Sequence, residues 1–182
     1  MKIKLSNVRL AFPVLFEAKT VNGEGKPAFS ASFLIDPADP QCKELNKAIE
    51  QVAKDKWGAK ADGILKQMRA QDKVALHDGD LKSNYDGFPG NLYVSARSAT
   101  RPLVIDKDKS PLTEQDGKPY AGCYVNASVE LWPQDNNYGK RINASLRGVQ
   151  FLRDGDAFAG GGAASEDEFD DISQGAMADD LV

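Results

Sequence analysis

The sequence predicts a mainly β protein: a small Greek-key barrel with a helical insertion at about residues 40–70 and a disordered acidic C-terminal tail. Three observations predict it. Several short segments alternate apolar and polar residues between Gly, Pro, Asp and Asn clusters, one segment repeats apolar residues every three to four positions, and residues 154–182 hold nine acidic residues and no Lys or Arg. The chain therefore divides into a domain at 1–153 and a Gly-rich linker with an acidic tail at 154–182.

The N-terminal half predicts two strands. In residues 2–10 the apolar phase shifts near Asn7, which indicates a β-bulge at that point. A loop follows at 22–25, and then residues 27–35 alternate regularly. The expected core face of this second strand consists of Phe29, Ala31, Phe33 and Ile35.

A helical insertion follows the second strand. Asp39 is suited to the N-cap and Pro40 to the first helical position. Gly58 ends the helix, and a shorter helix with Ile64, Leu65 and Met68 is expected after it. The apolar stripe of the first helix, which we expect to pack against the core, consists of Leu45, Ala48, Ile49, Val52, Ala53 and Trp57.

The second half returns to strands, which are separated by polar loops. The expected strands are 91–98, 102–105, 122–132 and 140–150, and the expected loops are 78–90, 106–119 and 133–139. The periodicity supports a small β-barrel or sandwich with a helical insertion. About five twisted strands with a helical element between them suit closure in the manner of an OB-fold, which is a further inference.

Composition argues against an enzyme and against a bound metal or cofactor. A single histidine and two distant cysteines cannot assemble a His/Cys zinc set, and neither a P-loop nor a nucleophile elbow is present. Asp78, Asp80 and Asp86 lie near His77 and leave a two-metal nuclease as a distant alternative. The neighbouring glycines favour turn residues instead.

Residues 1–153 carry 23 basic and 18 acidic side chains, a net charge of +5, although the whole chain has a net charge of −4. The sequence shows neither a signal peptide nor a long apolar stretch. We therefore expect a cytosolic protein with reduced thiols at Cys42 and Cys123 and no membrane association.

Aromatic and cationic side chains share the polar face of the later strands. This pattern is what binding of a single nucleic-acid strand needs, because rings stack on bases and cations follow phosphates. The candidate binding residues are Tyr93, Arg97, Arg101, Tyr124, Trp132, Lys140, Arg141 and Arg147, with Lys2, Lys4 and Arg9 as groove-edge cations. Two alternatives remain open: a protein–protein adaptor with an aromatic sheet face, and ordinary packing of these rings under a loop.

Five stretches in the same order resemble a family of phage-encoded single-stranded DNA-binding proteins. These stretches are 76–80 (LHDGD), 92–102 (LYVSARSATRP), 120–128 (YAGCYVNAS), 135–137 (DNN) and 148–155 (GVQFLRDG). The resemblance implies an OB-fold that coats single-stranded DNA without sequence preference during phage replication or recombination in the host cytoplasm. It implies no catalysis. RNA binding and homodimer formation are left open.

The tail resembles the acidic tails of replication single-strand binders, which dock on replication proteins. The resemblance implies that the tail docks on partners. Independently of it, nine negative charges on a Gly-rich tether could reach a cationic groove and compete with DNA there. The chain departs from the usual pattern because it lacks a terminal aromatic residue. The tail residues that would serve a partner are Phe169, Asp170, Asp171, Asp179, Asp180, Leu181 and Val182.

Overall fold

The strands close into a barrel. The computed structural model describes residues 1–21, 23–158 and 169–173, and in them one sheet has the strand order β3-β4-β2-β1-β6-β7-β5. The strands are β1 (Lys2–Val21), β2 (Glu24–Ile35), β3 (Leu76–Asp78), β4 (Leu92–Ser98), β5 (Leu103–Ile105), β6 (Tyr124–Asn136) and β7 (Gly139–Arg153).

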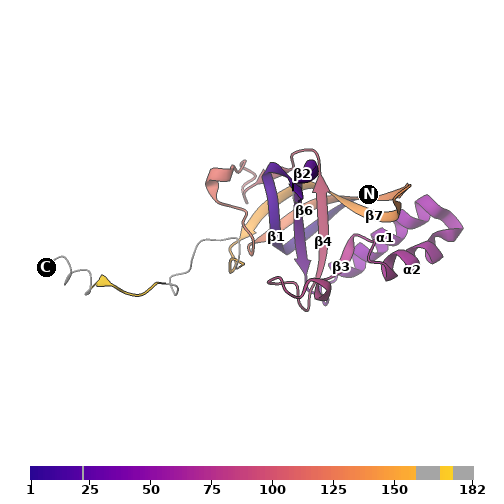
Figure 1. Cartoon of the computed structure of the whole chain (residues 1–182), viewed down its shortest axis with the longest axis horizontal. Helices are drawn as coiled ribbons and strands as arrows, with labels where there is room; N and C mark the ends of the chain where they lie inside the picture. The colour runs from indigo at the N-terminus through magenta and orange to yellow at the C-terminus, as the bar shows by residue number, and fades with distance from the viewer. Residues whose placement is uncertain (22, 159–168, 174–182) are drawn as a thin grey trace.

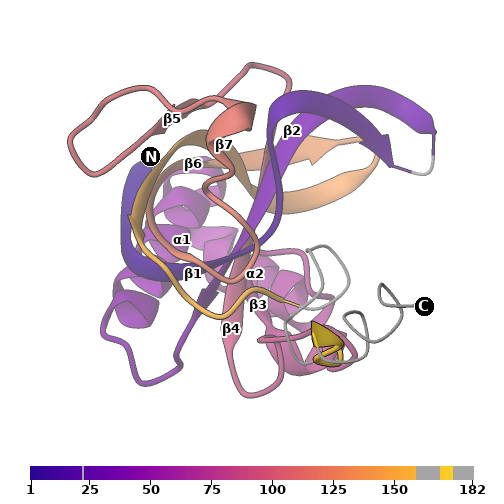
Figure 2. The same cartoon turned by 90° about the vertical axis from the view of Figure 1, so that its left-hand side faces the viewer.

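The pairing of β4 with β7 closes the ring. It is parallel and joins Arg97 to Ser145, whereas β1 pairs antiparallel with both β2 and β6. The ring therefore runs β1-β2-β4-β7-β6 (Figure 2). This connectivity confirms the OB-fold-like Greek-key barrel that the sequence predicted.

The alternating pattern correctly predicts the barrel core. Phe29, Ala31, Phe33 and Ile35 of β2 are all buried in the main hydrophobic cluster. The register of β1 shifts between Leu5 and Val8, where Asn7 has a φ of 53°, so the expected bulge is confirmed. Both cysteines are free and buried, and burial raises the pKa of the Cys123 thiol to about 11.

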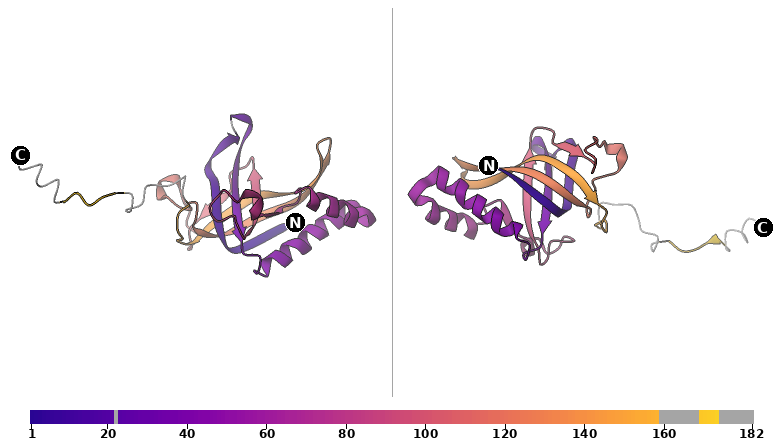
Figure 3. Two further views of the ribbon diagram at one scale, coloured as in Figure 1. Left: turned by 60° about the horizontal axis from the view of Figure 1, so that its bottom comes forward. Right: turned by 180° about the vertical axis from the view of Figure 1, so that it is seen from behind.

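Two hairpins extend beyond the ring as separate arms (Figure 3). β1 continues to Val21 instead of ending at residue 10, and it forms the first hairpin with β2. The loop expected at 133–139 is wrong, because β6 and β7 stay paired as far as Asn136 and Gly139. Polar residues in 133–139 indicated a loop, but in a solvated two-stranded hairpin they need no apolar partner.

Two helices lie at one end of the barrel (Figure 1). They are α1 (Gln41–Trp57) and α2 (Ala61–Ala70), joined by the 3-10 turn η1 (Gly58–Lys60), and this confirms the helical insertion. Asp39 accepts a hydrogen bond from the Gln41 amide at 3.0 Å and so satisfies one free N–H of the first turn. Trp57 packs against the core, as the stripe predicted. No described helix is long and apolar enough to cross a membrane.

A second, smaller apolar cluster lies outside the barrel core. It contains the buried residues Ala11, Leu34, Phe88 and Tyr93, with Phe158 packed against them. Phe88 comes from the segment that the sequence assigned to a loop at 78–90, which also contains the 3-10 turn η2 (Gly79–Lys82). This segment covers part of the outer face of the sheet.

Residues 154–158, here called the strap, also lie against the barrel. Tyr120 donates a hydrogen bond from its hydroxyl to Asp154 Oδ1 at 2.7 Å, and the Phe158 amide donates to the Ala121 carbonyl at 3.1 Å. The sequence assigned the strap to the linker, but these five residues contact the body of the protein.

Candidate nucleic-acid interface

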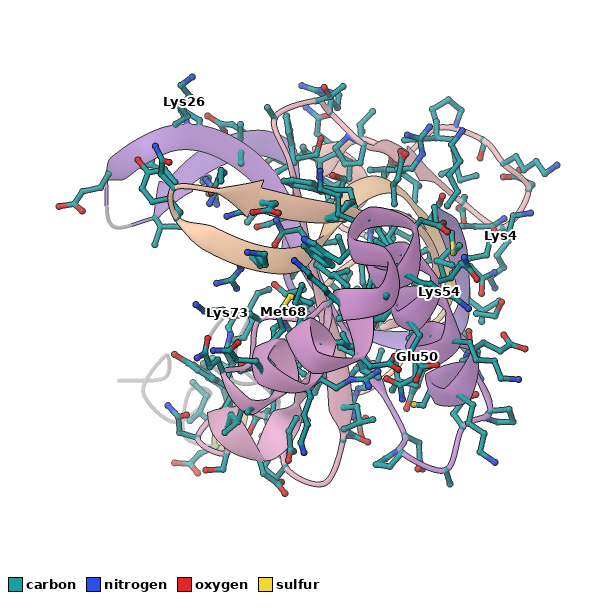
Figure 4. All side chains as sticks on the ribbon, turned by 90° about the vertical axis from the view of Figure 1, so that its right-hand side faces the viewer. Lys4, Lys26, Glu50, Lys54, Met68 and Lys73 are labelled. Carbon is teal, nitrogen blue, oxygen red and sulfur yellow. The ribbon has the colours of Figure 1, made fainter. Side chains whose placement is uncertain are left out.

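A groove of about 770 Å³ runs between the two hairpins over the outer face of β4. The start of β2 forms one wall and the β6–β7 hairpin forms the other (Figure 4, where Lys26 marks β2). The floor includes Ser95 and Ser145 of the strands that close the barrel. The groove therefore lies over the seam between β4 and β7.

The charge of the groove is positive. Lys26, Lys82, Arg97 and Arg141 line it, and among the described residues that line it there is neither Asp nor Glu. Arg97 donates a hydrogen bond to the Lys26 carbonyl at 3.2 Å, which ties β4 to the start of β2. Within the described parts of the chain, the Arg141 guanidinium has neither a hydrogen-bond nor an ion-pair partner, so it is available to an anion.

Trp132 supplies an accessible ring. It extends from β6 into the groove with 41% of its surface exposed, and Arg141 lies along the paired strand. An indole face beside free cations is suited to stack on an unpaired base.

Tyr93 also lines the groove, but the expectation of an open ring is wrong. It lies on the outer face of β4, and only 3% of its surface is exposed. His77 stacks on it at 4.8 Å between ring centroids, and Phe88 meets it edge-on at 5.1 Å. Burial, with a smaller contribution from Asp72, raises the pKa of the Tyr93 hydroxyl.

Tyr124 does not line the groove. The Arg153 guanidinium lies 3.7 Å from the centroid of its ring, and the Arg9 guanidinium lies 5.7 Å away. Arg9 also donates hydrogen bonds to the carbonyls of Gly122 and Asp156 and lies 4.3 Å from the Phe158 ring centroid. These residues hold the strap, so Tyr124 and Arg9 are already engaged by protein groups.

The remaining cations of the expected set, which include Lys2 and Lys4 of β1, also lie outside the groove lining. Arg101 contacts the Phe29 ring at 5.8 Å from its centroid. Lys140 pairs with Asp135 at 3.8 Å, and Arg147 pairs with Glu130 at 3.3 Å. The structure thus gathers Tyr93, Arg97, Trp132 and Arg141 and separates them from Tyr124, Arg101, Lys140 and Arg147.

Sequence reasoning missed three groove residues. Lys26 fell between an expected loop and an expected strand, and Lys82 was assigned to a polar connection. His77 was considered only beside a hypothetical metal site and within the 76–80 stretch of the resemblance. His77 Nδ1 instead lies 2.6 Å from Asp72 Oδ1. The alternation of strand residues could not place any of the three, because none of them lies in a strand that the sequence predicted.

The acids near His77 serve turns. Asp78 accepts a hydrogen bond from the Asp80 amide, and Asp80 accepts one from the Gly90 amide, both at 2.9 Å. Within the described residues no group of three or more His, Cys, Asp and Glu side chains could hold a metal ion. The turn interpretation of Asp78 and Asp80 is therefore confirmed.

None of the described tail residues lines the groove. Phe169, Asp170 and Asp171 are exposed, while the expected partner residues at 179–182 lie outside the described residues.

A small barrel with a cationic groove and an exposed ring defines the class of single-strand nucleic-acid-binding barrels. The comparison with protein families agrees. Residues 1–182 match the family described as "Enterobacter phage Enc34, ssDNA-binding protein", and the chain belongs to this non-enzymatic phage family.

Individual relatives place the chain further. It is 54% identical over 176 residues to "Putative protein p50" of Acyrthosiphon pisum secondary endosymbiont phage 1, and the match covers 95% of each chain. It is similar to the single-stranded DNA-binding protein of bacteriophage Enc34 in complex with ssDNA, with a TM-score of 0.74 and 29% identity over 87% of this chain and 89% of that one.

A more distant structure shares the fold. The single-stranded DNA-binding protein gp2.5 of bacteriophage T7 has a TM-score of 0.57 at 15% identity, over 90% of this chain and 98% of that one.

Proposed function

We propose that this chain binds single-stranded DNA in the groove, without sequence preference, and coats it during phage DNA replication or recombination in the host cytoplasm. The observation that carries the proposal is the groove itself, where four cations and the exposed Trp132 ring meet and where none of the described lining residues carries a carboxylate. Membership of the family and the similarity to a complex with ssDNA support it.

The proposed mechanism assigns separate tasks to rings and cations. Trp132 stacks on an unpaired base, which every base allows because each has a π-face. Arg97, Arg141 and Lys26 contact phosphates and fix the path of the strand without reading its sequence. A duplex keeps its bases stacked internally and cannot offer one to Trp132.

The experiment that tests this function is a titration with an unstructured oligonucleotide and with its duplex, over a range of salt concentrations. Neutralisation of about four phosphates gives a slope of log K against log[salt] of roughly −3 for a single strand. Equal affinity for the duplex, or an affinity independent of salt, would contradict the proposal. The same titration with RNA shows whether the 2′-hydroxyl is accepted, and added Mg²⁺ without cleavage argues against a nuclease.

We further propose that the acidic tail competes with DNA for the groove and docks replication proteins when DNA displaces it. Residues 159–182 carry seven of the acidic residues of the chain, so their removal changes the net charge from −4 to +3. A tethered anionic segment can act on a cationic groove at a high effective concentration.

Removal of residues 159–182 should tighten binding of single-stranded DNA, most strongly at low salt where screening is weakest. A full-length variant with the acids changed to Asn and Gln is the matched control for chain length. If neither protein binds more tightly at low salt, the tail is not a competitor.

A further inference from the structure

An exposed aromatic pair lies outside the groove. Phe12 of β1 is 49% exposed and Tyr85 of the 78–90 segment is 44% exposed. Their rings meet edge-to-face, with centroids 5.0 Å apart. Neither ring lines the groove, and the function proposed above does not use them.

The backbone of Phe12 is held in an unfavourable conformation. Its φ is 48°, which a residue with a bulky side chain rarely adopts, and it lies where the register between β1 and β2 shifts between Ala11 and Val14. Such a conformation is unfavourable for a bulky residue and is typical of functional sites. Here the unfavourable backbone belongs to a residue whose ring is exposed and only partly packed against the smaller apolar cluster.

A chain of ring contacts joins this pair to the groove. Tyr93 lines the groove and meets Phe88 at 5.1 Å, and Phe88 in turn lies 5.7 Å from Phe12 and 6.1 Å from Tyr85. The two exposed rings are thus two ring-to-ring steps from the groove wall.

Lys82 lies at the junction between the groove and the pair. It lines the groove, and its Nζ is 5.2 Å from the Tyr93 ring centroid and 5.9 Å from that of Phe88. A strand that leaves the groove at this end passes a cation first and the exposed rings next.

We propose that Phe12 and Tyr85 form a second stacking site for unpaired bases, which extends the path of single-stranded DNA beyond the groove at its Lys82 end. This inference rests on the function proposed above. Asp78 and Asp80, nearby in the chain, already accept backbone amides. The proposed site consists of two rings, so it contributes base stacking and not phosphate contacts.

The test compares a short oligonucleotide that fills only the groove with one longer by several nucleotides. Phe12→Gly removes the ring and relieves the positive φ, so it keeps the fold. Tyr85→Leu removes the second ring, and Tyr85→Phe retains it. We expect Phe12→Gly and Tyr85→Leu each to weaken binding of the longer strand by roughly 5- to 100-fold, the effect of one lost base stack. Tyr85→Phe should leave that affinity within about twofold.

Three controls separate this proposal from the function of the groove. Trp132→Ala should weaken both lengths, whereas Phe12→Gly should weaken only the longer one and leave its salt slope unchanged. Leu81 lies on the same segment and is 64% exposed, and Leu81→Ala should leave the affinity for both oligonucleotides unchanged. Abasic sites at one or the other end of the longer strand should reproduce the loss in the wild-type protein.

The outcomes are distinguishable. If Trp132→Ala weakens binding and Phe12→Gly and Tyr85→Leu do not, the groove function stands and the second site is wrong, and the pair is then a candidate protein contact. If the wild-type protein fails to bind either strand, both proposals fail.

Discussion

The groove and the strap region are built from the same kinds of side chain but differ in what those side chains contact. Beside the strap, Arg9 donates hydrogen bonds to two carbonyls and contacts the rings of Tyr124 and Phe158. The Arg153 guanidinium also contacts the ring of Tyr124. In the groove, Trp132 is exposed, and the Arg141 guanidinium has no hydrogen bond or ion pair within the described parts of the chain. The presence of arginines and aromatic rings therefore does not by itself identify an interface. What identifies it is that these side chains are exposed and not already bound by other groups of the protein.

The largest expected effect comes from removal of the accessible groove ring. Trp132→Ala should weaken binding of single-stranded DNA by about 1–3 kcal/mol, the value of one base–aromatic stack. The protein should remain folded, because this side chain lies outside the buried core. Fluorescence anisotropy with an unstructured oligonucleotide measures the affinity, and circular dichroism checks the fold. An unchanged affinity would remove Trp132 from the interface.

A matched pair of arginines sharpens the comparison. Arg141→Ala should reduce the slope of log K against log[salt] by about 0.7, because one phosphate contact is lost. Arg147→Ala should leave the slope nearly unchanged, since Arg147 pairs with Glu130 outside the groove. Titrations at several salt concentrations measure both slopes. Equal reductions in the two variants would show that DNA also follows the outer face of β7.

Removal of the ring that holds the strap should affect folding instead of binding. Tyr124→Ala removes two cation–π contacts, and it should lower the free energy of unfolding by about 1 kcal/mol. Urea denaturation measures this loss. The affinity of the folded protein for single-stranded DNA should stay within about twofold, and a larger loss would return Tyr124 to the interface.

The smallest expected effect is a change in titration near the tip of the β6–β7 hairpin. The Trp57 indole N–H donates to Asp135 Oδ2 at 3.0 Å, and this bond, with help from Lys140 and Lys56, lowers the pKa of Asp135. Trp57→Phe should raise that pKa towards its ordinary value, as NMR titration can measure. A lowered pKa stabilises the fold above the ordinary pKa of about 3.9, and this stability is lost as the pH falls through the folded value. An unchanged pKa would mean that the lysines dominate.

Local periodicity was sufficient to predict a small β-barrel or sandwich, the helical insertion and the outer faces of the strands that it identified. It did not predict β3 or the part of β1 beyond residue 10, and the choice of an OB-fold went beyond periodicity. The bulge at Asn7 is one example, since a shift in apolar phase directly reports an extra residue. Whether an outer face is open depends on distant segments. Tyr93 alternates like an open residue, but His77 of the paired strand β3 and Phe88 of the connection before β4 cover it.

The site was harder to predict than the fold for a related reason. Trp132 and Arg141 were expected from their strands. Lys26, in contrast, lies near the start of β2, and Lys82 lies in the 3-10 turn η2. Arg147 and Tyr124 satisfied the same alternation yet found protein partners. A pattern along one strand shows where a side chain points but not which groups reach it from elsewhere.

The second hairpin is fastened at its far side to the helical insertion. Trp57 at the end of α1 binds Asp135, and the Ile142 amide donates to the Lys73 carbonyl at 3.0 Å, just after α2. One wall of the groove is therefore held in place by Trp57 and Lys73, neither of which lines the groove. The width of the groove that is available to a ligand is therefore a property of the helical insertion as much as of the barrel.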